Sequence, residues 1–360
     1  MKRVLALLLV LITLLPLACA CGQSELKIEE TVTAETKAET AETGDAAESE
    51  TATVTEEKPA EPKPQSPYEQ SVTRILIIGN SASNDVFALL DKVFHAQGFG
   101  GKSYTLSYLY YSGCTFAQHV NFMKNNSPVY DYYKVSNGTS KTKETERTVK
   151  YALEDEAWDV IFLHPRGEED VLHSDLKLEL RRKIEAYVDQ YVPTEHVFGF
   201  HLRAVCPNDP EFYSGNWPVT PPAGYRERME EYYNFDPYVQ FSKGAEAVRT
   251  HILTDPTYKY NISTAAAVYY AQERMGVAQT ALYRDYTHLS DLGRVIAAYS
   301  FYAQFTGEPI EEVKLDAVPA KSRQSRYQSL GDLVLTEDLK HIIKTSANYA
   351  LEHPWDPIEK

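Results

Sequence analysis

Two short stretches, far apart in the sequence, hold residue types that cooperate in nucleophilic catalysis. Ser81 follows the apolar run at 75–78, and Asp285 and His288 stand three residues apart in one segment. A serine hydroxyl becomes a strong nucleophile when an imidazole takes its proton and a carboxylate orients that imidazole. An Asp-x-x-His segment supplies both helper groups. The alternative is that Asp285 and His288 only precede a helix that Ser290 or Asp291 caps.

A buried strand and an amphipathic helix are predicted on either side of Ser81. The Ile/Leu run at 75–78 lies between Arg74 and Gly79, as in a central strand of a parallel sheet. The apolar residues after Ser81 recur at helical spacing and stop at Gly98. Ser81 is therefore expected on a strand-to-helix turn, where α/β folds bind ligands and helix N–H groups favour an anion.

The rest of the sequence alternates predicted strands and helices. Further strands are expected at 104–111, 159–163, 196–202 and 258–264, and helices at 150–158, 176–191, 290–306 and 336–351. This alternation predicts a mostly parallel sheet with helices on both faces, a three-layer α/β/α sandwich. Residues 71–360 are expected to form one domain.

An aromatic and proline-rich connection is predicted at 203–238, after the strand at 196–202. A connection of this length in a compact domain is usually a functional cover or a small subdomain. Exposed aromatics in it, such as Tyr213 and Trp217, would be able to stack on sugar rings. The alternative is that the loop packs its aromatics onto its own domain.

Residues 1–21 have the pattern of an export signal. Met1-Lys2-Arg3 precedes an apolar segment too short to span a bilayer, and small residues surround Cys19 and Cys21. This resembles the bacterial lipoprotein signal, in which a cysteine is acylated. Cys21 is the preferred lipidation site, with Cys19 as the alternative, and the mature protein is then anchored on the outer face of the cell membrane.

Residues 22–70 are predicted to be a disordered acidic tether. They hold 13 acidic and 4 basic residues and almost no large apolar side chains, so they account for much of the net charge of −15. No clustered basic face appears elsewhere, and nucleic acid is therefore not an expected partner.

No metal or cofactor is expected from the motifs. The ten histidines form no H-E-x-x-H motif and no tight Cys/His cluster. Cys114 and Cys206 are the only cysteines of the expected domain, and the sequence leaves open whether they are free buried thiols or a disulfide.

The order and spacing of several motifs resemble the SGNH, or GDSL-type, hydrolase superfamily. The motifs in this sequence are Gly79-Asn80-Ser81 after the first strand, Gly113 after the second, and Asp285-x-x-His288 before a helix. A branch of bacterial SGNH-like proteins grouped only as a domain of unknown function is also similar in four runs: Trp158-Asp159-Val160-Ile161, Ser112-Gly113-Cys114, His288-Leu289-Ser290-Asp291-Leu292-Gly293-Arg294 and Phe305-Thr306-Gly307-Glu308. The resemblance covers residues 72–310 and implies a flavodoxin-like SGNH fold.

The resemblance implies roles for individual residues. Ser81 would be the nucleophile, His288 the base and Asp285 its orienting partner, with the N–H groups of Ser81 and Gly113 as oxyanion donors. After the third strand the superfamily has an amide side chain as a further donor, whereas this sequence has His164-Pro165-Arg166. His164 or Arg166 would replace it, and Asn80 joins Tyr213 and Trp217 as a candidate substrate contact.

The expected function is that of an exported serine esterase, with a small acyl group on an extracellular carbohydrate as the substrate. The altered segment after the third strand also allows a weak or inactive enzyme, because one oxyanion donor contributes about 10²–10³ in rate. The alternatives are a non-catalytic glycan-binding lipoprotein with the same fold and an acyltransferase that uses the same serine.

Overall fold

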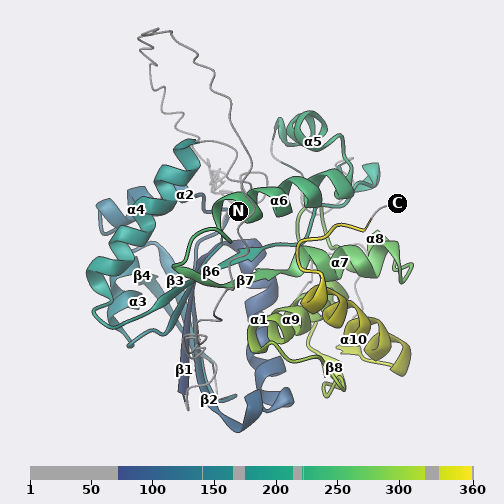
Figure 1. Cartoon of the computed structure of the whole chain (residues 1–360), viewed down its shortest axis with the longest axis horizontal. Coiled ribbons are helices and arrows are strands. Elements are labelled where there is room, and N and C mark those ends of the chain that lie inside the picture. The colour runs from purple at the N-terminus through teal and green to yellow at the C-terminus, as the bar shows by residue number, and fades with distance from the viewer. Residues whose placement is uncertain are drawn as a thin grey trace, which may run out of the picture. The chain divides into compact units, whose positions relative to one another are not determined.

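A seven-stranded sheet forms the centre of the computed structural model, which describes residues 72–139, 141–164, 175–213, 221, 223–320 and 332–358. The strand order is β4-β3-β2-β1-β5-β6-β7 (Figure 1). β1, β2, β5, β6 and β7 pair in parallel, and β3 and β4 are antiparallel. The strands span Val72–Gly79 (β1), Ser103–Tyr110 (β2), Tyr130–Ser136 (β3), Thr142–Arg147 (β4), Val160–Leu163 (β5), Val197–Leu202 (β6) and Tyr258–Ser263 (β7).

Helices cover both faces of the sheet because β1 is apolar on both sides. Ile75 and Ile77 pack into one hydrophobic cluster, and Leu76 and Ile78 into another. α1, α7 and α9 line the first face, and α2, α3 and α4 the second (Figure 1). The helices span Ser81–Gln97 (α1), Phe116–Lys124 (α2), Val149–Glu154 (α3), Asp175–Tyr191 (α4), Tyr225–Tyr233 (α5), Pro237–His251 (α6), Thr264–Glu273 (α7), Gln279–Leu282 (α8), Asp291–Thr306 (α9) and Glu337–Glu352 (α10). The predicted three-layer α/β/α fold is confirmed.

The parallel strands follow the flavodoxin-like order, in which β1 lies between β2 and β5. In such sheets ligands bind outside the carboxyl ends of the strands, at the position where the strand order reverses. Here the carboxyl end of β1 lies between those of β2 and β5, and β1 is followed by the Ser81 turn.

The antiparallel pair β3 and β4 was not expected from the sequence. β4 carries the run Thr142-Lys-Glu-Thr-Glu-Arg147, which is largely exposed and lacks an apolar face. Charged side chains of this kind protect a sheet edge from pairing with other chains. The lack of apolar alternation explains why the pattern gave no strand signal.

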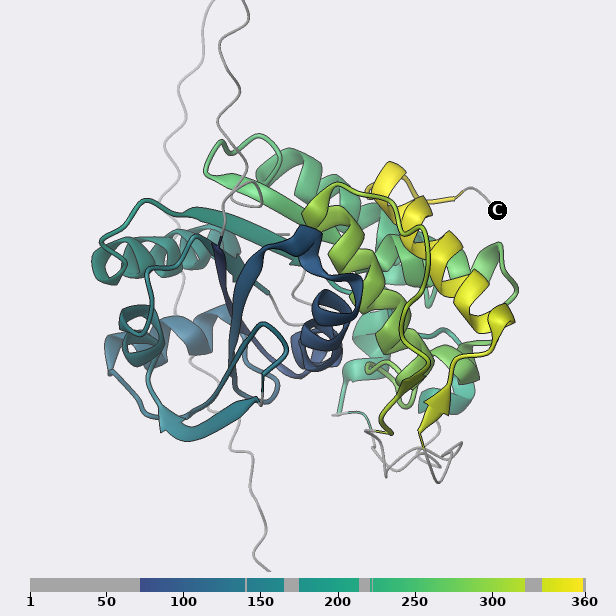
Figure 2. The same ribbon diagram turned by 90° about the horizontal axis from the view of Figure 1, so that it is seen from below.

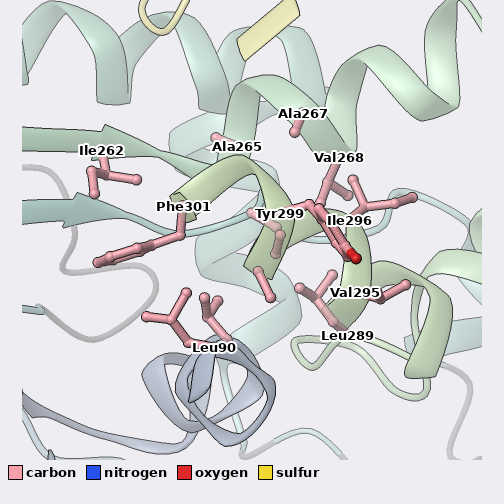
Figure 3. Packing of buried hydrophobic residues seen from close by; sticks show 14 of the residues in the cluster. Leu90, Ile262, Ala265, Ala267, Val268, Leu289, Val295, Ile296, Tyr299 and Phe301 are labelled. Carbon is pink, nitrogen blue, oxygen red and sulfur yellow. The ribbon is translucent and has the colours of Figure 1, made fainter. Parts of the chain in front are cut away.

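α1 and α9 pack against each other on one face of the sheet (Figure 2). Figure 3 shows Leu90 of α1 beside the apolar side chains of α9, among them Phe301, with Ile262 of β7 close by. Leu289, which directly follows His288, lies in the same cluster. Packing of the two helices therefore brings the start of α1, with Ser81, and the His288 loop that precedes α9 to one end of the sheet.

The connection at 203–238 packs largely onto its own domain. It contains a short 3₁₀ turn, Pro210–Tyr213, and α5. Tyr213 is buried, stacks near Tyr225 and donates its hydroxyl to the Pro207 carbonyl at 2.6 Å. The expectation that Tyr213 offers an exposed face to sugar rings is therefore wrong. Trp217 lies outside the described residues.

The C-terminal part adds a short strand pair, Ala317–Val318 (β8) with Leu333–Val334 (β9), and the long helix α10. α10 packs against α7 and α9, and its buried Ile343 and Ala347 extend the first hydrophobic cluster.

Among the described residues, no helix has the length and apolar composition to cross a membrane. Cys19, Cys21 and the acidic tether lie outside the described residues.

The two cysteines of the domain are free thiols. Cys114 and Cys206 are both buried, and no disulfide joins them. The Sγ of Cys206 lies 3.3 Å from a guanidinium nitrogen of Arg203 and 3.1 Å from the hydroxyl of Tyr225. Of the two possibilities that the sequence left open, the structure has the buried free thiols.

Candidate active site

The Asp285–His288 segment folds into a tight loop in which the carboxylate holds the imidazole. The Nδ1 atom of His288 lies 2.9 Å from each carboxylate oxygen of Asp285. The same carboxylate accepts the backbone N–H groups of Thr287 (2.9 Å) and His288 (2.8 Å). Asp285 is buried, whereas 17% of the His288 side chain is exposed. The carboxylate thus orients the imidazole through Nδ1, and the ring stays partly exposed, as a base in catalysis must be.

Asp285 is held in its ionised form. Burial raises the pKa of this carboxyl, but the hydrogen bond and charge of His288, the Thr287 N–H group and the Arg284 guanidinium together lower the pKa below its usual value. A carboxylate that accepts several hydrogen bonds keeps its charge in a buried position. Asp285 is therefore available to stabilise an imidazolium on His288.

Ser81 is the first residue of α1, and the turn before it is rigid. The Asn80 side chain accepts the Ala82 N–H group at 3.0 Å, and the Ser83 hydroxyl accepts the Asn80 N–H group at 2.8 Å and donates to the Asn80 carbonyl. A side chain on Gly79 would approach Ser83 to within 2.2 Å, so only glycine fits there. Ser83 is buried and engaged, whereas Ser81 is partly exposed. Ser81 is thus the accessible serine of this turn.

Two contacts bring the His288 loop to α1. The carboxylate of Asp85, one helical turn after Ser81, accepts the Leu289 N–H group at 2.9 Å and a guanidinium N–H of Arg284 at 2.8 Å. Four residues of α-helix rise about 6 Å, so the loop is anchored close to Ser81. Within the described part of the chain no hydrogen bond joins Ser81 to His288. Catalytic hydrogen bonds are often long without substrate and tighten when it binds.

Arg203, directly after β6, fastens the same loop from the other side. Its guanidinium donates to the hydroxyl and to the carbonyl of Thr287, both at 2.9 Å. Thr287 precedes His288 in the loop, and Arg203 is buried. The loop is therefore held by α1 on one flank and by the end of β6 on the other.

The second oxyanion donor predicted from the sequence lies in the loop after β2. Gly113 has a φ of 64°, a left-handed conformation that glycine adopts without strain. The Asn80 side chain donates to the Cys114 carbonyl at 3.2 Å and so ties this loop to the Ser81 turn. Among the described residues, neither the Ser81 nor the Gly113 N–H group donates to an acceptor. Both N–H groups remain candidate oxyanion donors.

Asn80 was predicted to contact substrate, but its side chain is buried and binds backbone groups of the protein instead. Its side chain is buried, caps α1 and holds the Gly113 loop. A residue with these contacts fixes the geometry of both oxyanion donors.

His164 lies beneath the Ser81 turn and is fully buried. The backbone N–H group of His164 donates to the Ile78 carbonyl and so continues the pairing of β1 with β5. The centre of its ring lies 4.7 Å from the centre of the His201 ring. Burial, with the nearby His201 and Arg203, lowers the pKa of His164 well below its usual value, and burial lowers the pKa of His201 to about 3. Both rings are therefore neutral. The role of His164 as an oxyanion donor stays a prediction, and Arg166 lies outside the described residues.

The structure brings the predicted Asp285 and His288 together, but the sequence did not reveal the residues that position them. Asp85 interrupts the apolar stripe of α1, and Arg203 directly follows a buried strand; each is an isolated charge at a position where the pattern predicts burial. Arg284 precedes Asp285 in the loop. Within the ranges that the structure describes, no group of three or more His, Cys, Asp or Glu side chains is arranged to hold a metal ion.

A family match covers the first half of this site. Residues 74–195 match the family model "Domain of unknown function (DUF4886)". The DUF4886 segment contains the Ser81 turn, the Gly113 loop and His164, and ends before the Asp285–His288 loop. The match confirms the predicted resemblance to a family grouped only as a domain of unknown function.

Two solved structures are similar to this chain. One is the crystal structure, at 1.50 Å, of a DUF4886 family protein from Bacteroides uniformis ATCC 8492, with a TM-score of 0.60 and 20% identity over 80% of this chain and 98% of that chain. The other is a protein from Slackia heliotrinireducens described as "a putative SGNH hydrolase", with a TM-score of 0.37 and 18% identity over 66% of this chain and 100% of that one. No protein of curated function matches the sequence. The likeness to the Bacteroides protein supports the α/β fold.

Proposed function

We propose that this protein is a serine hydrolase that cleaves carboxylic esters. The observation that carries the proposal is the loop in which Asp285 holds the His288 imidazole at 2.9 Å while the outer side of the ring stays open. That loop is anchored to the helix whose first residue is Ser81. A buried carboxylate, an oriented imidazole and a serine at a helix N-terminus are the parts of a serine nucleophile site.

The reaction follows from the role of each group. His288 takes the proton of the Ser81 hydroxyl as the oxygen attacks the acyl carbon, and Asp285 stabilises the imidazolium. The N–H groups of Ser81 and Gly113 donate to the oxyanion. His288 then protonates the leaving alcohol, and a water molecule, deprotonated by His288, releases the acyl group from Ser81.

Small acyl groups on an extracellular carbohydrate are the proposed substrates. The support is the signal-like sequence at 1–21 together with the resemblance to the SGNH superfamily; Tyr213 no longer contributes, because it is buried.

On this proposal Cys21 carries the lipid that holds the protein on the outer face of the membrane. The variant Cys21→Ala, expressed in a bacterium, is expected to appear in the soluble fraction after cell fractionation. Full retention in the membrane fraction, with Cys19 also replaced, would rule out the anchor.

Hydrolysis of 4-nitrophenyl acetate by the full chain tests the ester hydrolase proposal. The unmodified chain is expected to show turnover that Ser81→Ala abolishes. A chain that gives no turnover above the buffer rate, with this and longer acyl esters, would instead favour a non-catalytic binding protein.

Ser83→Ala is the matched control, because the two serines stand two residues apart in the same turn. Ser83 completes the capping box of α1, so its loss is expected to reduce the free energy of unfolding by about 1 kcal/mol. Turnover at 25 °C should fall far less than in Ser81→Ala, because Ser83 supports the backbone of the turn and takes no part in the proton transfer. Thermal unfolding and ester turnover measured on the same samples check both parts, and a loss of turnover as large as that of Ser81→Ala would contradict the assignment of the nucleophile.

A further inference from the structure

One buried carboxylate joins the helix of Ser81 to the loop of His288. Asp85 is 1% exposed, and its two oxygens accept from different donors: Oδ2 from the Leu289 N–H group and Oδ1 from Arg284. Arg284 immediately precedes Asp285, and Leu289 immediately follows His288. A single side chain therefore binds both flanks of the four-residue loop.

We propose that Asp85 is a positioning residue that holds the His288 loop against Ser81 and keeps the Arg284 guanidinium from moving onto the Asp285 oxygens that bind His288. The proposal rests on the proposed serine hydrolase function. Asp85 does not touch the reacting atoms. It acts through the placement of His288 and through the charge balance around Asp285.

The first half of the proposal follows from the donors. A carboxylate has only acceptor atoms, and both of its partners here are donors. Asparagine has nearly the same shape, but it offers one oxygen and one NH₂ group, so it must direct a donor at either Leu289 or Arg284. Asp85→Asn therefore loses one of the two hydrogen bonds that Asp85 makes to the flanks of the loop. Because a displacement of about 1 Å in a catalytic group lowers the rate about 10²-fold, a small movement of His288 is sufficient.

The second half follows from the charges that surround Arg284. Its Nη1 atom lies 2.8 Å from Asp85, while its Nε atom lies only 3.9 Å from Oδ2 of Asp285. The other nearby ions are already paired, since Arg294 binds Asp291 at 2.9 Å and donates to the Asp85 carbonyl at 3.1 Å. Without the Asp85 charge, the nearest carboxylate for Arg284 is Asp285. A guanidinium there competes with His288 for the oxygens that orient the imidazole.

The test compares Asp85→Asn, the double variant Asp85→Asn/Arg284→Gln and a matched control in the full chain. Asp255→Asn is the control: Asp255 is also buried, accepts a backbone N–H from Thr257 and pairs with Arg181 and Arg182. It precedes β7, at the opposite end of the strands from Ser81.

Two measurements are made on each variant. The first is kcat and KM for 4-nitrophenyl acetate. The second is the resonance of the His288 Nδ1 proton in ¹⁵N-histidine-labelled protein, assigned by its loss in His288→Gln. This proton reports the hydrogen bond to Asp285 whether or not the protein turns over an ester.

The proposal predicts that Asp85→Asn lowers kcat about 10²-fold with KM nearly unchanged, and that the His288 proton signal shifts or is lost through exchange with water. The double variant should recover the signal and part of kcat, because the competing cation is gone. Asp255→Asn should keep the kcat and the His288 proton signal of the unmodified chain, even if it lowers the free energy of unfolding.

An unchanged kcat and an unchanged proton signal in Asp85→Asn would overturn the proposal. A double variant that is as impaired as Asp85→Asn would overturn the part that concerns Arg284. If the unmodified chain shows the His288 signal but no turnover, the hydrolase proposal fails, and the response of the signal to Asp85→Asn still decides whether Asp85 positions the loop.

Discussion

Replacing His288 with alanine is expected to lower kcat for an aryl ester by about 10⁴–10⁶, the range that loss of the general base produces in serine hydrolases. His288 combines an orienting carboxylate with a partly exposed ring, whereas His164 and His201 are fully buried and neutral. Steady-state kinetics with 4-nitrophenyl acetate, over a range that defines both kcat and KM, measure the effect. KM should change little, because His288 acts mainly in the transition state.

The Ser81→Ala/His288→Ala double variant shows whether the two residues act as one unit. Groups that serve a single proton transfer are strongly non-additive, so the double variant should be no slower than the poorer single variant. Rate losses that multiply would mean that Ser81 and His288 act independently. Circular dichroism of each variant provides the control for folding.

Replacing Asp285 with asparagine is expected to lower kcat about 10⁴-fold while KM stays nearly constant. The carboxylate accepts from the His288 Nδ1–H group and so leaves Nε2 as the free base. An asparagine NH₂ group in the same position favours the opposite tautomer, in which Nε2 carries the proton and is not a base. The kinetic assay with 4-nitrophenyl acetate measures the loss. Asp255→Asn again serves as the matched control.

The same variant should also change how stability depends on pH. The pKa of Asp285 lies below its ordinary value in the folded state, so the folded state binds this proton less tightly than the unfolded chain. Its contribution to the free energy of unfolding is therefore fully present above the unfolded pKa, about 3.9, and is lost as pH falls through the folded pKa.

Thermal unfolding of the unmodified chain and Asp285→Asn between pH 7 and pH 3 measures this contribution. The difference between their unfolding midpoints should be largest above about pH 5 and should narrow as the solution becomes more acidic. A difference that stays constant over this range would mean that the Asp285 pKa is not lowered by folding.

Local patterns in the sequence were sufficient for the parallel strands and for the contact between Asp285 and His288. The apolar run of β1 predicts a central strand because both of its faces are buried, and the helical spacing after Ser81 predicts α1. The Asp-x-x-His spacing predicts a carboxylate beside an imidazole, because three residues in a tight loop bring the two side chains together. Each of these features depends on residues close in sequence.

The features that the sequence did not reveal depend on distant residues or on exposed ones. Asp85 and Leu289 are 204 positions apart, and Arg203 and Thr287 are 84 positions apart. No periodic pattern links such pairs; only the packing of α1 against α9 and the end of β6 brings them together. β4 was missed for the opposite reason, since a charged edge strand has no buried face to mark it.

The burial of Tyr213 shows the limit of composition as a guide to binding. An aromatic and proline-rich segment has the residues of a sugar-binding surface, but it also has those of a small core. Here Phe212, Tyr213, Tyr225 and Tyr233 are all buried in the main hydrophobic cluster. Apolar area removed from water stabilises the fold wherever partners are available, and the body of the domain supplies them.

The most direct measurement of the central claim is the position of a covalent fluorophosphonate adduct on the intact chain. Serines activated by an imidazole react with this probe, whereas ordinary surface serines do not. Mass spectrometry of the digested protein should find one adduct, on Ser81, and none in His288→Ala, while Asp255→Asn should label like the unmodified chain. An unlabelled protein, or an adduct on another serine that survives His288→Ala, would contradict the account.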